Sequence, residues 1–349
     1  MLSKEQMNSY LTHWISADGP ERDIVLSSRI RLARNLENER HPNFANNEAR
    51  RAISERVQET IAKQDKIKLK YLNITDLAEI EKEILVEKHL ISPAHAKGDC
   101  EKGVFLDEKE SVSIMLNEED HIRIQVLAAG MQLNKLWEIA NDFDDILEEK
   151  LDFSFSEKWG YLSTCPTNVG TGLRASVMIH LPALNLTKNI NKMLGAVSQL
   201  GLAVRGLYGE GSESLANIYQ ISNQITLGHS EIDIIRNLKS VCSQIIEQEK
   251  KARKRLLEED EIDLKDGVRR SYGALKYAYH ISTDEAMKLL SNVKLGIDLG
   301  IIEDVDNKIL SELMILIRPA HIQKIYGEKL ESPERNIKRA ELIQARLET

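Results

Sequence analysis

The sequence predicts an α+β fold in which a largely antiparallel sheet is flanked by helices and followed by a small all-α domain. Two observations carry this prediction. Up to about residue 228, segments of alternating apolar and polar residues are mixed with segments of helical period. From Ser230 onward the period is helical and remains so to the end of the chain.

Alternating segments identify the expected strands, and their contiguous or hairpin-like arrangement favours antiparallel pairing. They span residues 24–32, 111–126, 172–181, 202–209 and 217–224. These same segments carry charged residues that are unusual in strands. The charges therefore need a functional or structural explanation.

Helix signals organise the second part of the chain. Ser230, with Asp233 three residues later, indicates a capped helix start, and the apolar residues that follow share one face: Ile234, Leu238, Val241, Ile245 and Ile246. Residues 247–266 are so charged that we expect an exposed helix or linker there. We place the domain boundary near residue 255, giving a catalytic domain of residues 1–255 and a helical domain of residues 256–349. The last helix is expected to begin at Ser332-Pro333, with Ser332 as the N-cap and proline at the first helical position.

Composition narrows the class of protein. The 349 residues, 42% of them hydrophobic, can build two domains with buried cores. Cys100, Cys165 and Cys242 fit neither a zinc pattern nor a disulfide framework, so we expect no metal site and a reducing cytoplasm as the setting. We find no signal peptide or membrane span, and a net charge of −8 argues against nucleic acid as a partner.

Five arginines lie in the expected strands beside apolar residues. The two-residue period of a strand places Arg29 and Arg31 on one face while Ile30 and Leu32 point to the other. The others are Arg123, Arg174 and Arg205. Arginines flanked by buried aliphatic residues are costly to desolvate unless paired, and five that converge would form a clamp for a polyphosphate. Five separate surface ion pairs are the alternative.

Other routes to nucleotide binding are missing from the sequence. It contains no G-x-x-x-x-G-K-[ST] loop, no G-x-G-x-x-G after a strand and no His-Arg-Asp catalytic loop. A P-loop enzyme and an ordinary protein kinase are therefore disfavoured.

Four motifs, in this order, resemble those of the phosphagen (guanidino) kinase family. They are SSRIRLARN from Ser27, NEEDHIR from Asn117, CPTNVGT from Cys165 and RGLYGE from Arg205. The resemblance covers roughly residues 22–255. It implies a guanidino kinase catalytic domain that binds ATP with Mg²⁺, chiefly through arginines.

The resemblance also implies the nucleotide-binding residues. His89 matches a histidine near the adenine, although taken alone it would be an ordinary surface or core histidine. The full implied set is Ser27, Ser28, Arg29, Ile30, Arg31, His89, Arg123, Arg174, Ala175, Ser176, Val177, Met178, Arg205, Gly206, Leu207, Tyr208 and Gly209.

The chemistry of a guanidinium explains why carboxylates are needed. A guanidinium stays protonated up to a pKa above about 12, so its nitrogens are poor nucleophiles until it is aligned and loses a proton. By resemblance, Glu119 and Glu210 align it and one of them acts as general base, while Cys165 contacts the guanidinium and its thiolate is stabilised by the surrounding positive charge. The sequence alone favours an exposed hairpin residue for Glu119 and a loop carboxylate for Glu210.

Two departures from the small-molecule guanidino kinases resemble the protein-arginine kinase branch of the family. Only 26 residues precede Ser27, where creatine and arginine kinases have a helical domain, and a helical extension follows residue 255. The branch marks proteins with phosphoarginine for stress-linked proteolysis. The resemblance implies proteins with exposed arginines as substrates, and a zinc-finger activator protein, a heat-shock repressor and a Clp unfoldase as partners. The oligomeric state is left open, with a homodimer as one alternative.

The extension contains one more motif of that branch. Its Arg-Asp-x-x-Arg-Ala sequence binds phosphoarginine, and here the matching residues are Arg335, Asn336, Arg339 and Ala340. Asn336 replaces the aspartate and removes a charge that would pair with the ligand. A solvated basic helix without a ligand is the alternative.

Two other functions compete with a protein-arginine kinase. One is a small-molecule arginine or creatine kinase. The second is a non-catalytic adaptor that only reads phosphoarginine, which the presence of Glu119 and Glu210 disfavours.

Overall fold

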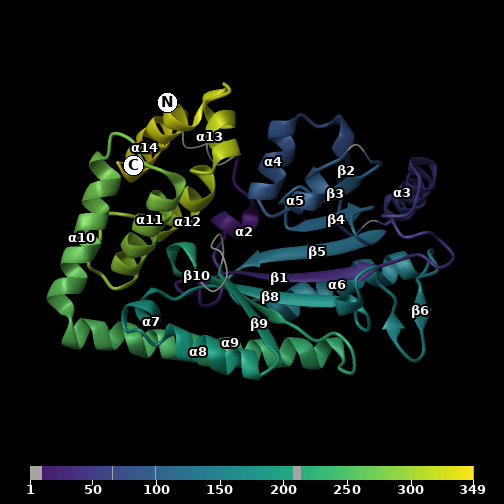
Figure 1. Cartoon of the computed structure of the whole chain (residues 1–349), viewed down its shortest axis with the longest axis horizontal. Coiled ribbons are helices and arrows are strands. Elements are labelled where there is room, and N and C mark those ends of the chain that lie inside the picture. The colour runs from purple at the N-terminus through teal and green to yellow at the C-terminus, as the bar shows by residue number, and fades with distance from the viewer. Residues whose placement is uncertain (1–9, 65, 99, 207–213, 349) are drawn as a thin grey trace.

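An antiparallel sheet forms the centre of the catalytic part. The structure, a computed structural model, describes residues 10–64, 66–98, 100–206 and 214–348. In these ranges eight strands pair in the order β2-β3-β4-β5-β1-β8-β10-β9, every neighbouring pair antiparallel (Figure 1). The strands are β1 (Val25–Arg34), β2 (Leu69–Asn73), β3 (Gly103–Asp107), β4 (Val112–Leu116), β5 (Ile122–Ala129), β8 (Leu173–His180), β9 (Leu202–Gly206) and β10 (Ile218–Asn223).

The predicted strands are confirmed within a few residues of their ends, except that residues 207–209 of the expected strand 202–209 lie outside the described residues. The expected strand 111–126 is a hairpin, β4 and β5, because the acidic turn between them reverses the chain. A small separate ribbon pairs β6 (Phe155–Ser156) with β7 (Gly160–Tyr161).

One face of the sheet is apolar and covered by helices. Ile30 and Leu32 of β1 are fully buried there, as the two-residue period predicted. The helices α6 (Leu133–Glu148), α8 (Ile190–Gln199) and α9 (Glu231–Glu259) pack against this face. The remaining elements of this part are α2 (His13–Ser16), α3 (Asn47–Ala62), α4 (Glu79–Glu87), α5 (Pro93–Ala96), α7 (Pro182–Leu186) and the short 3-10 turns Ile74–Asp76, Pro166–Asn168 and Leu215–Asn217.

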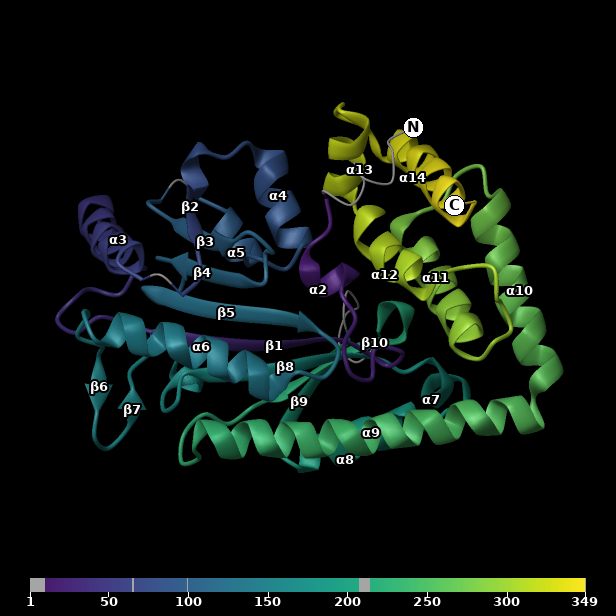
Figure 2. The ribbon, with the colours of Figure 1, turned by 180° about the vertical axis from the view of Figure 1, so that it is seen from behind.

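The helical part follows α9, which runs along the sheet and continues beyond it to α10 (Figure 2). Ser230 caps α9 by accepting a hydrogen bond from the backbone N–H of Asp233, as predicted. The chain then bends at Asp260. The helices are α10 (Glu261–Tyr277), α11 (Thr283–Asp298), α12 (Asn307–Leu316), α13 (Pro319–Tyr326) and α14 (Ser332–Leu347). The prediction that Ser332 caps the last helix was wrong by one residue, because Glu331 is the N-cap and Ser332 already lies in the first turn.

The charged run 247–266 is helical, but the prediction that it is exposed was wrong for two of its charged residues. Glu249 and Arg253 are buried. The Nη1 of Arg253 lies 3.2 Å from Oδ2 of Asp298, which also lies 3.0 Å from Nζ of Lys294. Asp298 and Lys294 belong to α11, which is distant from α9 in the sequence. The charges of Arg253, Lys294 and Asp298 compensate one another where the helical part meets the catalytic part.

No helix in the described ranges combines the length and the apolar character that crossing a membrane requires.

Replacing Asp298 with alanine tests the buried charge network. Asp298→Ala leaves Arg253 and Lys294 buried beside each other without that carboxylate, so we expect the free energy of unfolding to fall by about 3–5 kcal/mol. Urea denaturation followed by circular dichroism measures the change. The matched control is Asp266→Ala, whose ion pair with Arg270 is exposed, and we expect a change below about 1 kcal/mol there. Equal effects of the two substitutions would contradict a structural role for the network.

Candidate active site

A cavity of about 420 Å³ opens on the polar face of the sheet and contains all five predicted arginines. Because β1, β5, β8 and β9 each present their outward residues on this face, arginines far apart in the sequence meet. The residues that line the cavity are Arg29, Arg31, Leu32, Ala33, Glu119, Arg123, Cys165, Thr167, Asn168, Gly172, Arg174, Arg205 and Gln220.

Like charges stand opposite each other in this cavity. Arg31 of β1 and Arg174 of β8 are direct cross-strand partners, an arrangement that is destabilising unless an anion lies between them. Burial lowers the pKa of Arg31 well below its ordinary value, and the nearby guanidiniums act in the same direction. The cavity therefore holds an excess of positive charge that favours a polyanion.

Neutral side chains hold two of the arginines in place. Arg29 donates to Oε1 of Gln220 at 2.9 Å and to Oγ of Ser176 at 3.3 Å. Arg174 donates to Oγ of Ser222 at 3.3 Å. Because these acceptors are uncharged, they orient the guanidiniums without cancelling their charge.

Two adjacent glutamates of the β4–β5 turn play different parts. The side chain of Glu118 is only 6% exposed, accepts a hydrogen bond from Ser92 and forms an ion pair with Arg123. Glu119 is 41% exposed and lies 3.1 Å from Nη2 of Arg123, at the cavity. Glu119 is thus the carboxylate that an incoming cation can reach, whereas Glu118 fixes the arginine.

A buried aspartate ties this turn to the loop that carries Cys165. Oδ1 of Asp120 accepts from Nδ2 of Asn35 at 2.7 Å and from the backbone N–H of Thr164 at 2.8 Å. Sγ of Cys165 lies 3.0 Å from Oγ1 of Thr167. Asp120 therefore sets the position of Glu119 and Cys165 relative to each other, a role that no sequence pattern indicated.

His89 lies in a second cavity that adjoins the first. It follows α4 with a φ of 60°, a left-handed conformation that ends the helix. Its backbone carbonyl accepts from Nε2 of Gln125 at 2.8 Å. Burial lowers the pKa of His89 to about 3, and Arg29 and Arg318 add to this effect, so the ring is neutral at pH 7.

Some predicted residues lie away from the cavity or outside the described ranges. The side chains of Ile30, Ala175 and Val177 are in the apolar core on the opposite face. Ser27 is buried, and Ser28 donates to the carbonyl of Gly130 at 2.7 Å. Ser176 accepts a hydrogen bond from Arg29, Met178 lines a small cavity with His89, and Gly206 ends β9. Leu207, Tyr208, Gly209 and Glu210 lie outside the described residues.

The candidate phosphoarginine residues lie on α14. Arg339 is almost fully buried and donates to the carbonyls of Ile317 at 2.7 Å and Ile281 at 2.9 Å, and to Oδ1 of Asn336 at 2.6 Å. Arg335 donates to the carbonyl of Leu330 at 2.6 Å, and Ala340 is buried. Oδ1 of Asn336 thus already accepts a hydrogen bond from Arg339.

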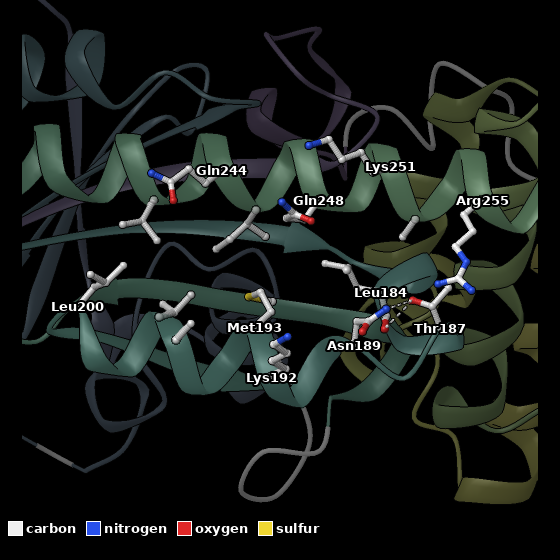
Figure 3. A pocket seen from close by; sticks show the side chains of 15 residues that line it. Leu184, Thr187, Asn189, Lys192, Met193, Leu200, Gln244, Gln248, Lys251 and Arg255 are labelled. Atoms are coloured by element: carbon white, nitrogen blue, oxygen red, sulfur yellow. Dashed lines mark hydrogen bonds between the residues drawn. The ribbon is translucent and has the colours of Figure 1, made fainter.

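A separate apolar groove of about 470 Å³ lies between α8 and α9. Figure 3 shows Met193 and Leu200 on one side of it and Gln244, Gln248 and Lys251 on the other. None of the predicted site residues that the structure describes lines this groove. The arginine cavity, and not the groove, contains the groups that can carry phosphoryl-transfer chemistry.

Known proteins share both parts of this architecture. A family model described as ATP:guanido phosphotransferase, C-terminal catalytic domain, matches residues 52–252, and one described as Protein-arginine kinase McsB C-terminal domain matches residues 261–349. The chain belongs to the ATP:guanido phosphotransferase family and is an enzyme of that family.

Over its whole length the chain is similar to bacterial protein-arginine kinases, which confirms the resemblance predicted from the motifs. It is 64% identical to the protein-arginine kinase of Halothermothrix orenii over 347 residues, 99% of each chain. It is 51% identical to that of Bacillus subtilis, covering 99% of this chain and 96% of the relative. A lombricine kinase structure, 23% identical, shares the fold with a TM-score of 0.59 and 69% coverage of each chain.

Asp120→Ala tests the positioning role of the buried aspartate. Without its carboxylate the turn of Glu119 and the loop of Cys165 lose their shared anchor, so we expect the turnover number to fall about 100-fold, the scale of a misplacement near 1 Å. Nucleotide affinity should change little, because Asp120 does not line the arginine cavity. Steady-state kinetics and calorimetry with ADP separate the two quantities. Asp142→Ala, an exposed residue of α6, is the control. An unchanged turnover number in Asp120→Ala would contradict the assignment.

Proposed function

We propose that the chain is an ATP-dependent kinase that phosphorylates arginine side chains of proteins. The observation that carries the proposal is the cavity in which five arginines face one partly exposed carboxylate, that of Glu119. An anionic phosphate chain suits the arginines, and a cationic guanidinium suits the carboxylate. The similarity to bacterial protein-arginine kinases supports a protein as the carrier of that guanidinium.

ATP is positioned by the arginines in this mechanism. Arg29, Arg31, Arg123, Arg174 and Arg205 would hold the phosphate oxygens and stabilise the charge that develops on them during transfer. Among the described lining residues, Glu119 is the one carboxylate. This donor set fits Mg²⁺ that is bound mostly by phosphate oxygens and water, and Mg²⁺ would supply further neutralisation of the phosphate charge.

Proton removal prepares the nucleophile. Glu119 would accept hydrogen bonds from the guanidinium and take a proton from the attacking nitrogen, with Glu210 as the second carboxylate of the pair. The nitrogen–phosphorus bond then forms while the bond between the γ-phosphorus and the bridging oxygen breaks, leaving ADP. Cys165, at the same cavity, would contact the guanidinium and not form a covalent intermediate.

The wider role rests on the same proposal. Phosphoarginine would mark cytoplasmic proteins for stress-linked proteolysis, with a zinc-finger activator, a heat-shock repressor and a Clp unfoldase as partners. On α14, Arg335 and Asn336 would form the entrance of a phosphoarginine pocket whose floor is Arg339. The hydrogen bonds that Arg339 donates to Ile317, Ile281 and Asn336 support a preformed floor of this pocket.

Mass spectrometry of an unfolded protein substrate incubated with MgATP tests the function. Conditions that preserve acid-labile phosphorus–nitrogen bonds should reveal phosphate on arginine side chains. Free arginine at equal concentration, in the same assay, should be a much poorer acceptor. Transfer to free arginine alone would favour the small-molecule kinase.

Substitutions in the cavity should separate chemistry from nucleotide binding. We expect Glu119→Ala to reduce transfer about 100-fold or more with ADP affinity nearly unchanged, because a general base is lost. Arg205→Ala should weaken ADP binding by about 1.5–3 kcal/mol, the worth of a charge-assisted bond to phosphate. Calorimetry and a radiolabel assay measure the two effects. If Glu119→Ala weakened ADP binding and Arg205→Ala impaired only the transfer step, the roles assigned to the two residues would be wrong.

The pocket proposed on α14 predicts how two substitutions change the affinity for phosphoarginine. Asn336→Asp should raise the affinity for phosphoarginine by roughly 1 kcal/mol, because a carboxylate makes a charge-assisted bond where the amide makes a neutral one. Arg335→Ala should abolish that binding while transfer to unmodified substrate continues. Titration of phosphoarginine into the full chain provides the measurement. Binding that is unaffected by either substitution would place the ligand elsewhere.

A further inference from the structure

The second cavity is an extension of the first. Its volume is about 440 Å³, and its lining includes Arg29, Arg31 and Arg123, which also line the first cavity. Beyond these shared arginines its walls come from the end of α4 and the segment after it, including Val86, His89 and Ile91. A ligand whose phosphates lie on the shared arginines would therefore extend its remaining part into this space.

One wall of the extension belongs to the helical domain. Arg318 and Pro319, at the turn between α12 and α13, line the same cavity as His89. In both views of the ribbon, α13 lies beside α4 (Figures 1 and 2). Arg318, which completes the cavity, lies more than 190 positions after Arg123 in the sequence and belongs to a different domain.

This turn is held from both sides. Nε of Arg339 donates to the carbonyl of Ile317 at 2.7 Å, directly before Arg318. On the other side the carboxylate of Glu87, the last residue of α4, accepts from the backbone N–H groups of Ala320 at 2.9 Å and His321 at 3.0 Å. A carboxylate at the first turn of a helix is a favourable cap. Arg318 is therefore presented to the cavity by a turn anchored to both domains.

The charges around the extension favour an electron-rich ligand. Arg318 adds a fourth arginine to the three that the two cavities share. The carboxylate among the described lining residues, Glu87, is occupied by the start of α13. The positive charge of Arg318 contributes to lowering the pKa of His89. Guanidiniums stack on aromatic faces and donate to hydroxyl and phosphate oxygens, which are the groups of a nucleoside monophosphate unit.

We propose that Arg318, supplied by the helical domain, binds the nucleoside end of ATP in the cavity that it shares with His89. The proposal rests on the function proposed above, because the phosphates must occupy the strand arginines for the nucleoside to enter this space. Nucleotide binding then needs the helical domain in its docked position. The catalytic domain alone would bind the phosphate chain but hold the nucleoside less tightly.

Comparing ligands that contain and lack the nucleoside tests the proposal. Calorimetry with ADP and with inorganic tripolyphosphate is carried out on wild type, Arg318→Met and Arg123→Ala. Methionine keeps most of the apolar stem of Arg318 and removes the guanidinium. We expect Arg318→Met to lose about tenfold in ADP affinity, the range of one charge-assisted contact, and to keep its tripolyphosphate affinity. Arg123→Ala should lose affinity for both ligands.

Controls distinguish the possible failures. Arg270→Ala, on the exposed side of α10, should bind both ligands as wild type does. Thermal unfolding without ligand checks that Arg318→Met remains folded, and Arg318→Lys provides a second, charged variant that should recover part of the lost affinity. Equal ADP affinity in wild type and Arg318→Met would overturn the proposal. A wild type that binds neither ADP nor tripolyphosphate would instead overturn the proposed function.

Discussion

Repulsion among arginines on one face of the sheet is the constraint around which the site is built. Arg31 and Arg174 are cross-strand neighbours, and Arg29, Arg123 and Arg205 surround them. A sheet does not gain stability from such a pairing. The apolar opposite face, packed on α6 and α9, stabilises the sheet enough to carry the repulsion, and the repulsion is what makes the face a receptor for polyphosphate.

Buried polar contacts convert that face into a defined geometry. Arg34, on the same strand but facing the core, pairs with Asp144 of α6 at 2.6 Å and stacks on Tyr161. Asp120 connects the turn of Glu119 to the loop of Cys165. Each of these contacts lies outside the cavity, so they fix positions without adding a carboxylate to the cavity lining.

The period-2 alternation of the strands predicted the sheet face of the arginines, since Ile30 and Leu32 must be buried. The same pattern could not show that Glu118 is buried against Arg123 while its neighbour Glu119 reaches the cavity, because the turn geometry decides this. Nor could it reveal that Glu249 and Arg253 are buried, because Glu249 pairs with Arg253, whose second partner Asp298 lies on another helix. Arg318 had no local signal at all, since its role follows from how α13 docks beside α4. The family motifs supplied the chemistry, and the tertiary contacts supplied the positioning residues.

Thermal unfolding of wild type and Arg31→Met, each with and without excess ADP, tests the central claim most directly. Met removes one charge from the repulsive cluster, so the ligand-free variant should melt at a higher temperature than ligand-free wild type. ADP at about 100 times its dissociation constant should stabilise wild type by about 2.7 kcal/mol, which raises the melting temperature by several degrees, and should stabilise Arg31→Met by clearly less, because one charge-assisted bond to phosphate is lost. A ligand-free variant that melts below wild type and responds to ADP as wild type does would contradict the account.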